Sequence, residues 1–460
     1  MFDAKTYVQR RRRLAKDVGS GIVLFLGNDD CPMNYLANPF HFRQDSSFLY
    51  GFGLDSPGLA ALIDLDEGRE ILFGDDINIE DIIWMGFLPT LKERAALVGV
   101  KDTRPMKELA VLLRAAAAKG RTIHFLPSYR AEHSLKIESL LGIPPTEAKI
   151  SPALVAAIIK QRSVKSEAEV AEMETALKTT YKMYETAMRM AQPGVYEKDI
   201  AGRIDGLAIA DAGATAFPTI LTMDGQILHN HSHVHKLAKG RLLVVDAGAE
   251  SPLHYAADIT RTIPVGGRFT ARQREIYELV LAANENAIKA IKPGRMYKDI
   301  HLAAAKTIAV GLKGLGLMTG DMDEAVSRGA HALFFPHGLG HMIGLDVHDM
   351  ENLGEKNVGY DKTVERSDQF GLAYLRLAKA LRPGYVLTVE PGCYFIPALI
   401  DKWKAESKHL DFIAYDKLEK YRDFGGVRIE DDVLVTKDGR RVLGKPIPKK
   451  ADAVEDAATL

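Results

Sequence analysis

Short apolar runs alternate with stretches of helical periodicity along the first third of the chain. Residues 21–26 and 59–63 are continuous apolar runs typical of buried strands, whereas residues 106–118 and 130–141 have the spacing of helices. This alternation predicts an α/β domain.

The pattern changes near residue 163. Ser166 and Glu169 have the spacing of a capping box, which predicts a helix that ends at the Gln-Pro-Gly of residues 192–194. A second helix is expected from about Glu197, and strands from Thr219. We therefore predict one domain at residues 1–162, a second at 163–448, and a flexible tail at 449–460.

Three predicted strands of the second domain each end on an acid. Residues 242–246, 386–390 and 427–430 end on Asp246, Glu390 and Glu430. One such acid, taken singly, is ordinarily a strand end that faces water. A set of them is different, because a buried ionised carboxylate is costly unless it is paired or bound to a metal.

A fourth acid, Asp258, follows Asp246 after a short segment with Ser251 and Pro252 at its middle. A hairpin folded about Pro252 would place Asp246 directly opposite Asp258. Two like charges in that position destabilise the strand pair, and a cation between them would remove the penalty.

Two histidines, His337 and His341, are separated by residues that include Gly338 and Gly340. The glycines favour a turn or strand over the helix of a His-Glu-x-x-His zinc motif. The four acids carry four negative charges, which two divalent ions would balance. With one neutral histidine, such an oxygen-rich shell suits Mn²⁺, Co²⁺ or Zn²⁺.

Composition limits the remaining classes. The chain has 460 residues with 60 Lys and Arg against 61 Asp and Glu, so its charge gives no sign of nucleic acid or of an anionic membrane as partner. Two distant cysteines, the lack of a signal peptide and the lack of a membrane-length apolar run predict a cytoplasmic protein. The basic run at residues 10–13 is interpreted as a solvated helix face in preference to an anion site.

The order Asp, Asp, His, Glu, Glu resembles that of the pita-bread metallopeptidases, which include methionine aminopeptidase, aminopeptidase P and prolidase. The matching segments are residues 245–248, 257–262, 337–341, 389–392 and 426–431. Residues 41–50 resemble the N-terminal domain that aminopeptidase P and prolidase share. The resemblance implies an α/β N-terminal domain followed by an α+β pita-bread (creatinase/aminopeptidase-like) catalytic domain.

The resemblance also implies a ligand set for two divalent ions, with manganese as the first expectation and cobalt or zinc as alternatives. Asp246 would bind one ion, and His341 and Glu390 the other. Asp258 and Glu430 would bridge both.

Further roles follow from the same resemblance and from the metal site that it implies. Glu390 would shuttle the proton, while His348 would stabilise the oxyanion. His337 and His229 would lie near the substrate. Arg376 matches a prolidase arginine that holds the free carboxylate of a dipeptide, and Arg428 is expected to contact substrate.

The implied reaction is metal-dependent hydrolysis of the bond between an N-terminal residue and proline in small peptides. Arg376 favours Xaa-Pro dipeptides slightly, whereas the segment near residues 351–361 resembles bacterial Xaa-Pro aminopeptidases that act on longer peptides. An alternative of another class is a non-catalytic pita-bread binding protein, although relatives of that kind lose metal ligands. A homodimer or homotetramer is expected, with the first domain contributing to association.

Overall fold

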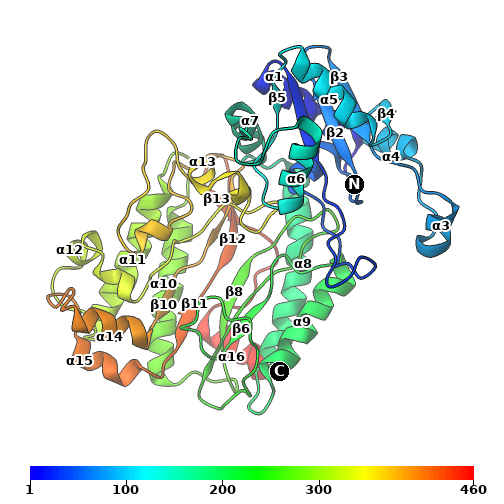
Figure 1. Cartoon of the computed structure of the whole chain (residues 1–460). Coiled ribbons are helices and arrows are strands. Elements are labelled where there is room, and N and C mark those ends of the chain that lie inside the picture. Colours follow the sequence, from blue (N-terminus) through cyan, green and yellow to red (C-terminus); the bar gives the residue numbers. More distant parts are fainter. Residues whose placement is uncertain (460) are drawn as a thin grey trace. The chain divides into compact units, whose positions relative to one another are not determined.

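The computed structural model describes residues 1–459, which form two compact units divided between Arg162 and Ser163. Figure 1 shows the elements of both units. Each unit has its own sheets and its own helices, and each is described by itself below. Among residues 1–459, no helix combines the length and the apolar character that a membrane span requires.

The first unit is built on one mixed five-stranded sheet in the order β4-β3-β2-β1-β5. β1, β2 and β3 pair antiparallel, while β5 is parallel to β1 and β4 is parallel to β3. The predicted strands and helices of this unit are confirmed as β1, β2, α5 and α6. The elements are α1 (Ala4–Val18), β1 (Ile22–Leu26), α2 (Ser46–Phe52), β2 (Ala60–Asp64), β3 (Arg69–Phe73), α3 (Ile79–Met85), α4 (Leu91–Leu97), β4 (Asp102–Arg104), α5 (Glu108–Ala118), β5 (Ile123–His124), α6 (Ala131–Leu141) and α7 (Pro152–Arg162).

The core of the first unit lies between the sheet and two helices. Leu24, Leu62 and Phe73 of the sheet pack with Leu113 of α5 and Ile137 of α6. The helix α3, by contrast, stands away from this sheet (Figure 1) and has no buried residue.

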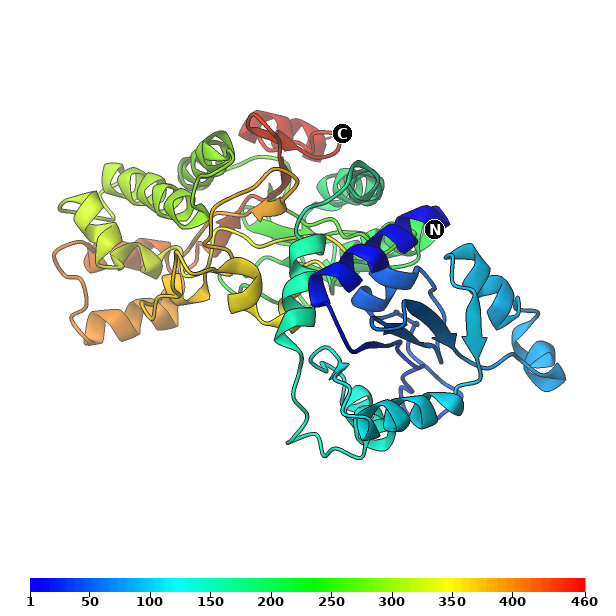
Figure 2. The same cartoon turned by 90° about the horizontal axis from the view of Figure 1, so that it is seen from above.

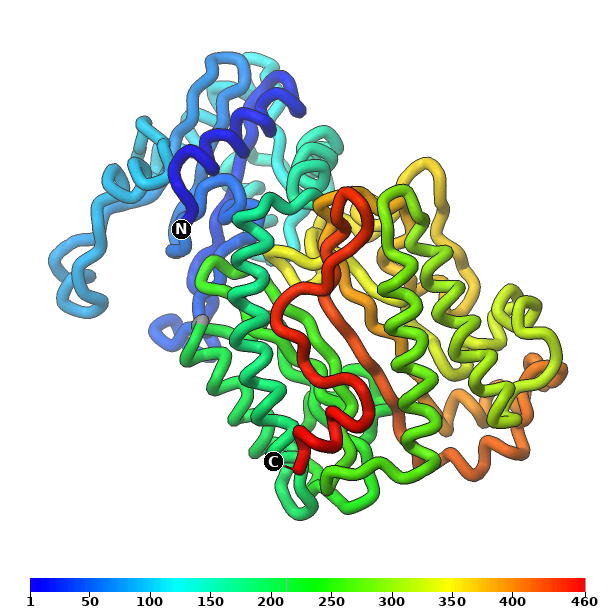
Figure 3. The backbone as a smooth tube through the Cα atoms, turned by 180° about the vertical axis from the view of Figure 1, so that it is seen from behind, coloured from blue at the N-terminus to red at the C-terminus, as the bar shows by residue number. Residues whose placement is uncertain are grey.

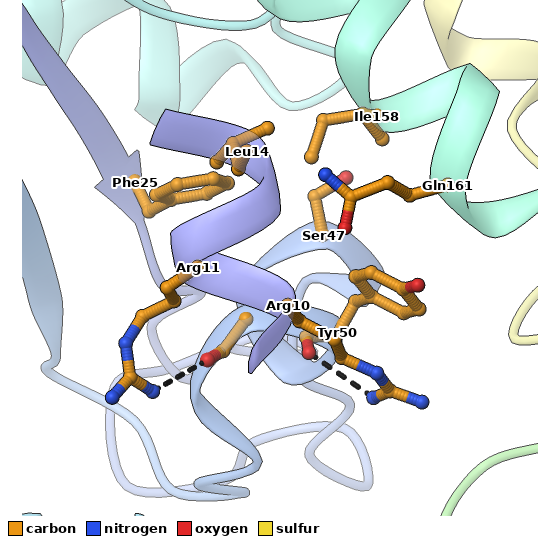
Figure 4. A pocket seen from close by; sticks show the side chains of 9 residues that line it. Arg10, Arg11, Leu14, Phe25, Ser47, Tyr50, Ile158 and Gln161 are labelled. Atoms are coloured by element: carbon orange, nitrogen blue, oxygen red, sulfur yellow. Dashed lines mark hydrogen bonds between the residues drawn. The ribbon is translucent and has the colours of Figure 1, made fainter. Parts of the chain in front are cut away.

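The predicted solvated face at residues 10–13 is wrong for half of the run. Arg10 and Arg11 are only 4% and 1% exposed, whereas Arg12 and Arg13 are exposed. Figure 4 shows both buried guanidiniums reaching the last turn of α2, where Arg10 donates to the carbonyl of Tyr50 (3.1 Å) and Arg11 to that of Gly51 (2.9 Å). The carbonyls of a helix C-terminus lack intrahelical partners, so they stabilise a buried cation.

The second unit places strands between two long helix pairs, in which α8 packs on α9 and α10 packs on α11. Its sheets have the orders β6-β7-β8, β13-β12-β9 and β10-β11. The elements are α8 (Glu167–Met190), α9 (Glu197–Ala212), β6 (Ile220–Thr222), β7 (Leu242–Ala247), β8 (Ile259–Pro264), α10 (Ala271–Ala290), α11 (Tyr297–Gly314), α12 (Met322–Ser327), α13 (Glu355–Gly359), β9 (Val386–Val389), β10 (Gly392–Tyr394), α14 (Pro397–Ala405), α15 (Tyr415–Leu418), β11 (Gly426–Arg428), β12 (Asp431–Val435), β13 (Arg440–Val442) and α16 (Ala451–Thr459). Figure 2 shows the same helices and strands from above.

The capping box at the start of α8 is confirmed. The Ser166 hydroxyl accepts from the amide of Glu169, and the Glu169 carboxylate accepts from the amide of Ser166 at 2.9 Å. Two amides that the first turn leaves without helical partners are thereby satisfied, which fixes where the helix begins.

The predicted register of the β7–β8 hairpin is wrong by two residues. Asp246 lies opposite Thr260 and not opposite Asp258. The turn is centred on Leu253, because the amide of Ser251 donates to the carbonyl of Tyr255 and the carbonyl of Ser251 accepts from the amide of His254, both at 2.8 Å. Since side chains alternate along a strand, the two-residue shift leaves both aspartates on the same face, as diagonal neighbours.

The predicted flexible tail is also wrong for residues 451–459, which form α16. Val454 and Ala458 are buried, and α16 packs against α8, β8 and α10. In Figure 3 this C-terminal segment runs between the long helices of the unit. The Glu455 carboxylate accepts from the amide of Phe269 (3.0 Å) and from Arg268 (2.8 Å), so polar as well as apolar contacts hold the helix.

Candidate metal centre

Strand pairing brings the four acids of the second unit together. Asp246 lies in β7, Asp258 directly precedes β8, Glu390 directly follows β9, and Glu430 lies between β11 and β12. Thr260 of β8 forms a bridge with Glu430, and β12 pairs antiparallel with β9. Four segments up to 184 residues apart therefore end beside one another.

The segment of His341 lies along β9 without being a helix, as its glycines predict. The amide of Thr388 donates to the carbonyl of His341 (3.0 Å), and the amide of His341 donates to the Thr388 hydroxyl (3.1 Å). A Cβ at Gly340 would lie 2.1 Å from the Thr388 carbonyl oxygen, so only glycine permits this approach.

His341 is oriented as a ligand. Its Nδ1 lies 3.1 Å from the carbonyl of Met342, which fixes the proton on that nitrogen. Nε2 then presents a lone pair toward the acids, 3.4 Å from Asp258 Oδ2 and 3.6 Å from Glu390 Oε1. Metal-binding histidines characteristically donate their other ring N–H in this way.

The donor set fits divalent cations. Ligand atoms of Asp258, His341 and Glu430 lie within 4.8 Å of one another. Among the described residues, Oδ1 of Asp246 and Oδ1 of Asp258 are buried without a hydrogen-bond partner. Buried carboxylate oxygens without partners are costly, and cations would satisfy them.

The pKa values of three of these acids are raised by burial and by the charges of their carboxylate neighbours. Burial, followed by the charge of Asp246, raises the pKa of Asp258 well above its usual value. Burial and the charges of Asp258 and Glu390 do the same for the pKa of Glu430, and burial with the charges of Asp258 and Asp246 raises the pKa of Glu390 to about 7. These carboxylates therefore destabilise one another's charge, as is expected of a site that holds cations.

Arg428 is the protein cation beside the acids. Its Nη2 lies 2.6 Å from Asp246 Oδ2, and its Nη1 donates to the Tyr394 hydroxyl at 3.0 Å. That hydroxyl lies 2.9 Å from Nε2 of His337, whose Nδ1 lies 2.8 Å from the carbonyl of Gly338. Burial lowers the pKa of His337 to about 3, so the imidazole is neutral and accepts from the tyrosine.

A cavity of about 570 Å³ opens onto this cluster. All ten site residues that the sequence predicts line it: His229, Asp246, Asp258, His337, His341, His348, Arg376, Glu390, Arg428 and Glu430. The structure thus brings the whole predicted set together. Much of the remaining wall is apolar, formed by Phe217, Pro218, Ile220, Leu228, Val347, Phe370, Tyr374, Ile396 and Leu399.

Several polar partners of these residues escaped sequence reasoning. Thr260 donates to Glu430 Oε2 at 2.6 Å and accepts from Arg428 at 3.1 Å. Tyr394 links Arg428 to His337, and Glu351 lies 3.1 Å from Nδ1 of His348. Thr260 and Tyr394 carry no local signal, because each contacts residues far away in the sequence. Glu351 lies only three residues from His348, so its spacing is the one local signal that could have found it.

Comparison with known proteins agrees with this geometry. Residues 171–437 match Metallopeptidase family M24, and residues 7–124 match the N-terminal domain of aminopeptidase P. The chain belongs to metallopeptidase family M24. The chain is therefore a metallopeptidase, and its family implies divalent metal ions.

Relatives of this M24 peptidase match it over most of their length. A human Xaa-Pro dipeptidase is 30% identical, with 97% of this chain and 90% of that protein covered. A probable Xaa-Pro aminopeptidase of Fusarium vanettenii is 33% identical, with coverage of 91% and 87%.

Solved structures give the same result for the fold. The Pseudomonas aeruginosa aminopeptidase PepP has a TM-score of 0.82 at 27% identity, with 100% of this chain and 98% of that chain covered. Escherichia coli aminopeptidase P with the inhibitor Pro-Leu has a TM-score of 0.80 at 27% identity and the same coverage. The predicted α/β N-terminal domain and pita-bread catalytic domain are confirmed, and the non-catalytic alternative is not favoured.

Proposed function

We propose that this protein hydrolyses the peptide bond between an N-terminal residue and proline, using two divalent metal ions. The observation that carries the proposal is the group of four carboxylates and His341 that lines the cavity, of which all except Glu390 are buried. Relatives named Xaa-Pro dipeptidase and Xaa-Pro aminopeptidase support the choice of bond.

In this proposal, Asp246 would help to hold one ion, His341 and Glu390 would help to hold the other, and Asp258 and Glu430 would contribute to both. Manganese is the first candidate, with cobalt or zinc as alternatives, since the donors are oxygens and one imidazole. When bound, such ions polarise a carbonyl group and make hydroxide available near neutral pH. Metal analysis of the purified protein, expected to give two ions per chain, tests the ligand set.

Glu390 is the proposed proton shuttle. Its side chain is 19% exposed, against 12% for Asp246 and 6% for Asp258, so it is the better placed to exchange a proton with a molecule in the cavity. It would accept the proton of the attacking water and return it to the proline nitrogen.

His348 is proposed to donate a hydrogen bond to the oxyanion that develops on the scissile carbonyl. Burial and the neighbouring His341 lower the pKa of His348 to about 4, and the Glu351 carboxylate beside Nδ1 opposes that shift. Glu351 would therefore stabilise the protonated ring in the transition state.

The apolar wall suits the proline ring. Proline has a fixed φ and, within a peptide, no N–H, so a site that selects it must recognise shape in place of a donor. His229 and His337 are proposed to lie near the ring. Arg428 is proposed to contact the substrate. Its hydrogen bonds to Asp246 and Tyr394 also hold these two side chains in place.

The test is hydrolysis of matched peptides by the manganese-loaded enzyme. Leu-Pro peptides should be cleaved at least a hundredfold faster than Leu-Ala peptides, and Glu390→Gln should lose at least a thousandfold in kcat with folding unchanged. Glu365→Gln, at an exposed position, is the matched control. Equal cleavage of Leu-Ala, or no cleavage of any Leu-Pro peptide with any of the three metals, would contradict the proposal.

We also propose a homodimer or homotetramer associated through the first unit. Its helix α3 and the residues after it expose Ile83 (71%), Trp84 (86%) and Phe87 (75%), an apolar group that association would cover. Light scattering of the wild type and of Trp84→Glu tests this, since the variant should shift toward the monomer.

A cytoplasmic location is the remaining proposal. Cys31 and Cys393 are both free thiols, as a reducing compartment favours. Cell fractionation followed by immunodetection tests the location directly.

A further inference from the structure

The cavity offers a substrate carboxylate one accessible cation. Within residues 1–459, two side chains that line the cavity carry a permanent positive charge, Arg376 and Arg428. Arg428 is 4% exposed and is engaged by Asp246 and Tyr394. The Arg376 side chain is 33% exposed. A free C-terminal carboxylate in the cavity would therefore have to be received by Arg376.

Arg376 already holds two carboxylates of the protein. Its Nη1 lies 2.5 Å from Glu351 Oε2 and 2.9 Å from Glu355 Oε1. Glu355 in turn lies 2.5 Å from Arg366. Two guanidiniums and two carboxylates sum to zero charge, so the cluster has no excess positive charge for a third carboxylate.

The two glutamates are fixed to Arg376 by the fold. Glu355 begins α13, and the far end of this helix packs directly on the backbone of Arg376. A Cβ at Gly359 would lie 1.7 Å from the Arg376 carbonyl oxygen, and the Gly359 carbonyl accepts from the amides of Ala378 (2.9 Å) and Lys379 (3.0 Å).

Glu351 has a second anchor. It lies 3.1 Å from Nδ1 of His348. Burial opposes its ionisation, but the hydrogen bond from His348 and the charge of Arg376 help to lower the pKa of Glu351 to about 2. The carboxylate is thus ionised and held in place at neutral pH, and it does not swing away to admit a ligand anion.

We propose that Glu351 and Glu355 are specificity residues that mask Arg376 from the carboxylate of a dipeptide and so direct the enzyme to Xaa-Pro peptides of three or more residues. This inference rests on the proposed Xaa-Pro activity. A longer peptide presents a neutral amide where a dipeptide presents a charge. The guanidinium has five N–H donors, and those that the glutamates leave available can donate to a peptide carbonyl without any need for excess positive charge.

The decisive comparison uses Leu-Pro and Leu-Pro amide, which differ at the C-terminus by one charge. The manganese-loaded wild type should cleave the amide with a kcat/KM at least tenfold higher. Glu355→Gln removes one negative charge at nearly constant shape, so it should reduce that ratio at least fivefold, mainly through a lower KM for Leu-Pro. Cleavage of the amide should change less than twofold.

The controls separate this inference from the proposed function. Glu365→Gln lies in the same segment, is exposed, and should leave the ratio unchanged. A wild type that prefers Leu-Pro, or a Glu355→Gln ratio equal to that of the wild type, overturns the inference while leaving the Xaa-Pro activity intact. Failure to cleave either substrate overturns the proposed function and the inference together. If Glu355→Gln does not fold, the wild-type ratio of kcat/KM for Leu-Pro amide to that for Leu-Pro still tests the inference.

Discussion

Glu430 and Asp431 are neighbours in the chain, yet their carboxylates have opposite electrostatic surroundings. Glu430 faces Asp258 and Glu390, and burial together with those charges raises its pKa well above the usual value. Burial also opposes ionisation of Asp431, but Arg261 at 2.8 Å and Lys449 at 2.6 Å lower its pKa to about 2. Consecutive side chains on a strand point to opposite faces, so one residue step separates the two environments.

The difference distinguishes a functional cluster from a structural one. On the Asp431 face the protein supplies its own cations, and the ion pairs hold β12 to β8 and to the chain before α16. On the Glu430 face Arg428 is the protein cation beside four acids, and the missing positive charge has to come from metal ions. The cluster of Arg376, Arg366 and their two glutamates resembles the Asp431 face, because its charges are already balanced.

The largest expected effect tests the Glu430 face. Glu430→Gln should abolish binding of the metal pair and lower kcat at least a thousandfold, because a carboxylate proposed to contribute to both ion sites is lost. Metal analysis and peptide hydrolysis measure both. Asp431→Asn is the matched control, and it should keep its metal. Full activity in Glu430→Gln would refute the ligand assignment.

For the unfolding free energy, the larger effect should come from Asp431→Asn and not from Glu430→Gln. Asp431→Asn leaves Arg261 and Lys449 without their carboxylate partner in a buried site, so unfolding free energy should fall by about 3 kcal/mol. Urea denaturation of the metal-free proteins measures this. Glu430→Gln should lose less unfolding free energy than Asp431→Asn, because it removes a charge that its surroundings disfavour. A larger loss in Glu430→Gln would contradict this difference between the two carboxylates.

Metal should stabilise the folded state through the Glu430 face alone. Manganese at a hundred times its dissociation constant raises the unfolding free energy by about 2.7 kcal/mol. Thermal denaturation with and without manganese should therefore show a shift in the wild type and in Asp431→Asn. A similar shift in Glu430→Gln would place the stabilising ion elsewhere.

The pH dependence gives the smallest effect. The folded pKa of Asp431, about 2, lies below its unfolded value of 3.8, so its contribution is fully present above about pH 4 and is lost as pH falls toward 2. That contribution is about 2 kcal/mol. The difference in stability between the wild type and Asp431→Asn should shrink over this range. A difference that is constant from pH 6 to pH 3 would mean that the ion pairs contribute nothing.

Sequence reasoning succeeded where the signal is local or repeated. The capping box of Ser166 and Glu169 involves residues three apart, and Asp246 and Glu390 each follow an apolar run. These patterns depend on short-range hydrogen bonding and on burial of a single strand. The tail prediction failed because Val454 and Ala458 become buried only against α8 and β8, which are distant in sequence.

The sequence by itself determined the kinds of donor, their order along the chain and the family that uses them. Only the tertiary structure decided partners: the β7–β8 register that sets Asp246 opposite Thr260, the α2 carbonyls that bury Arg10 and Arg11, and the glutamates that neutralise Arg376. The physical reason is that the electrostatic free energy of a charged group depends mainly on the charges and dipoles within a few ångströms of it. For these residues those neighbours come from other segments, so only folding brings them together.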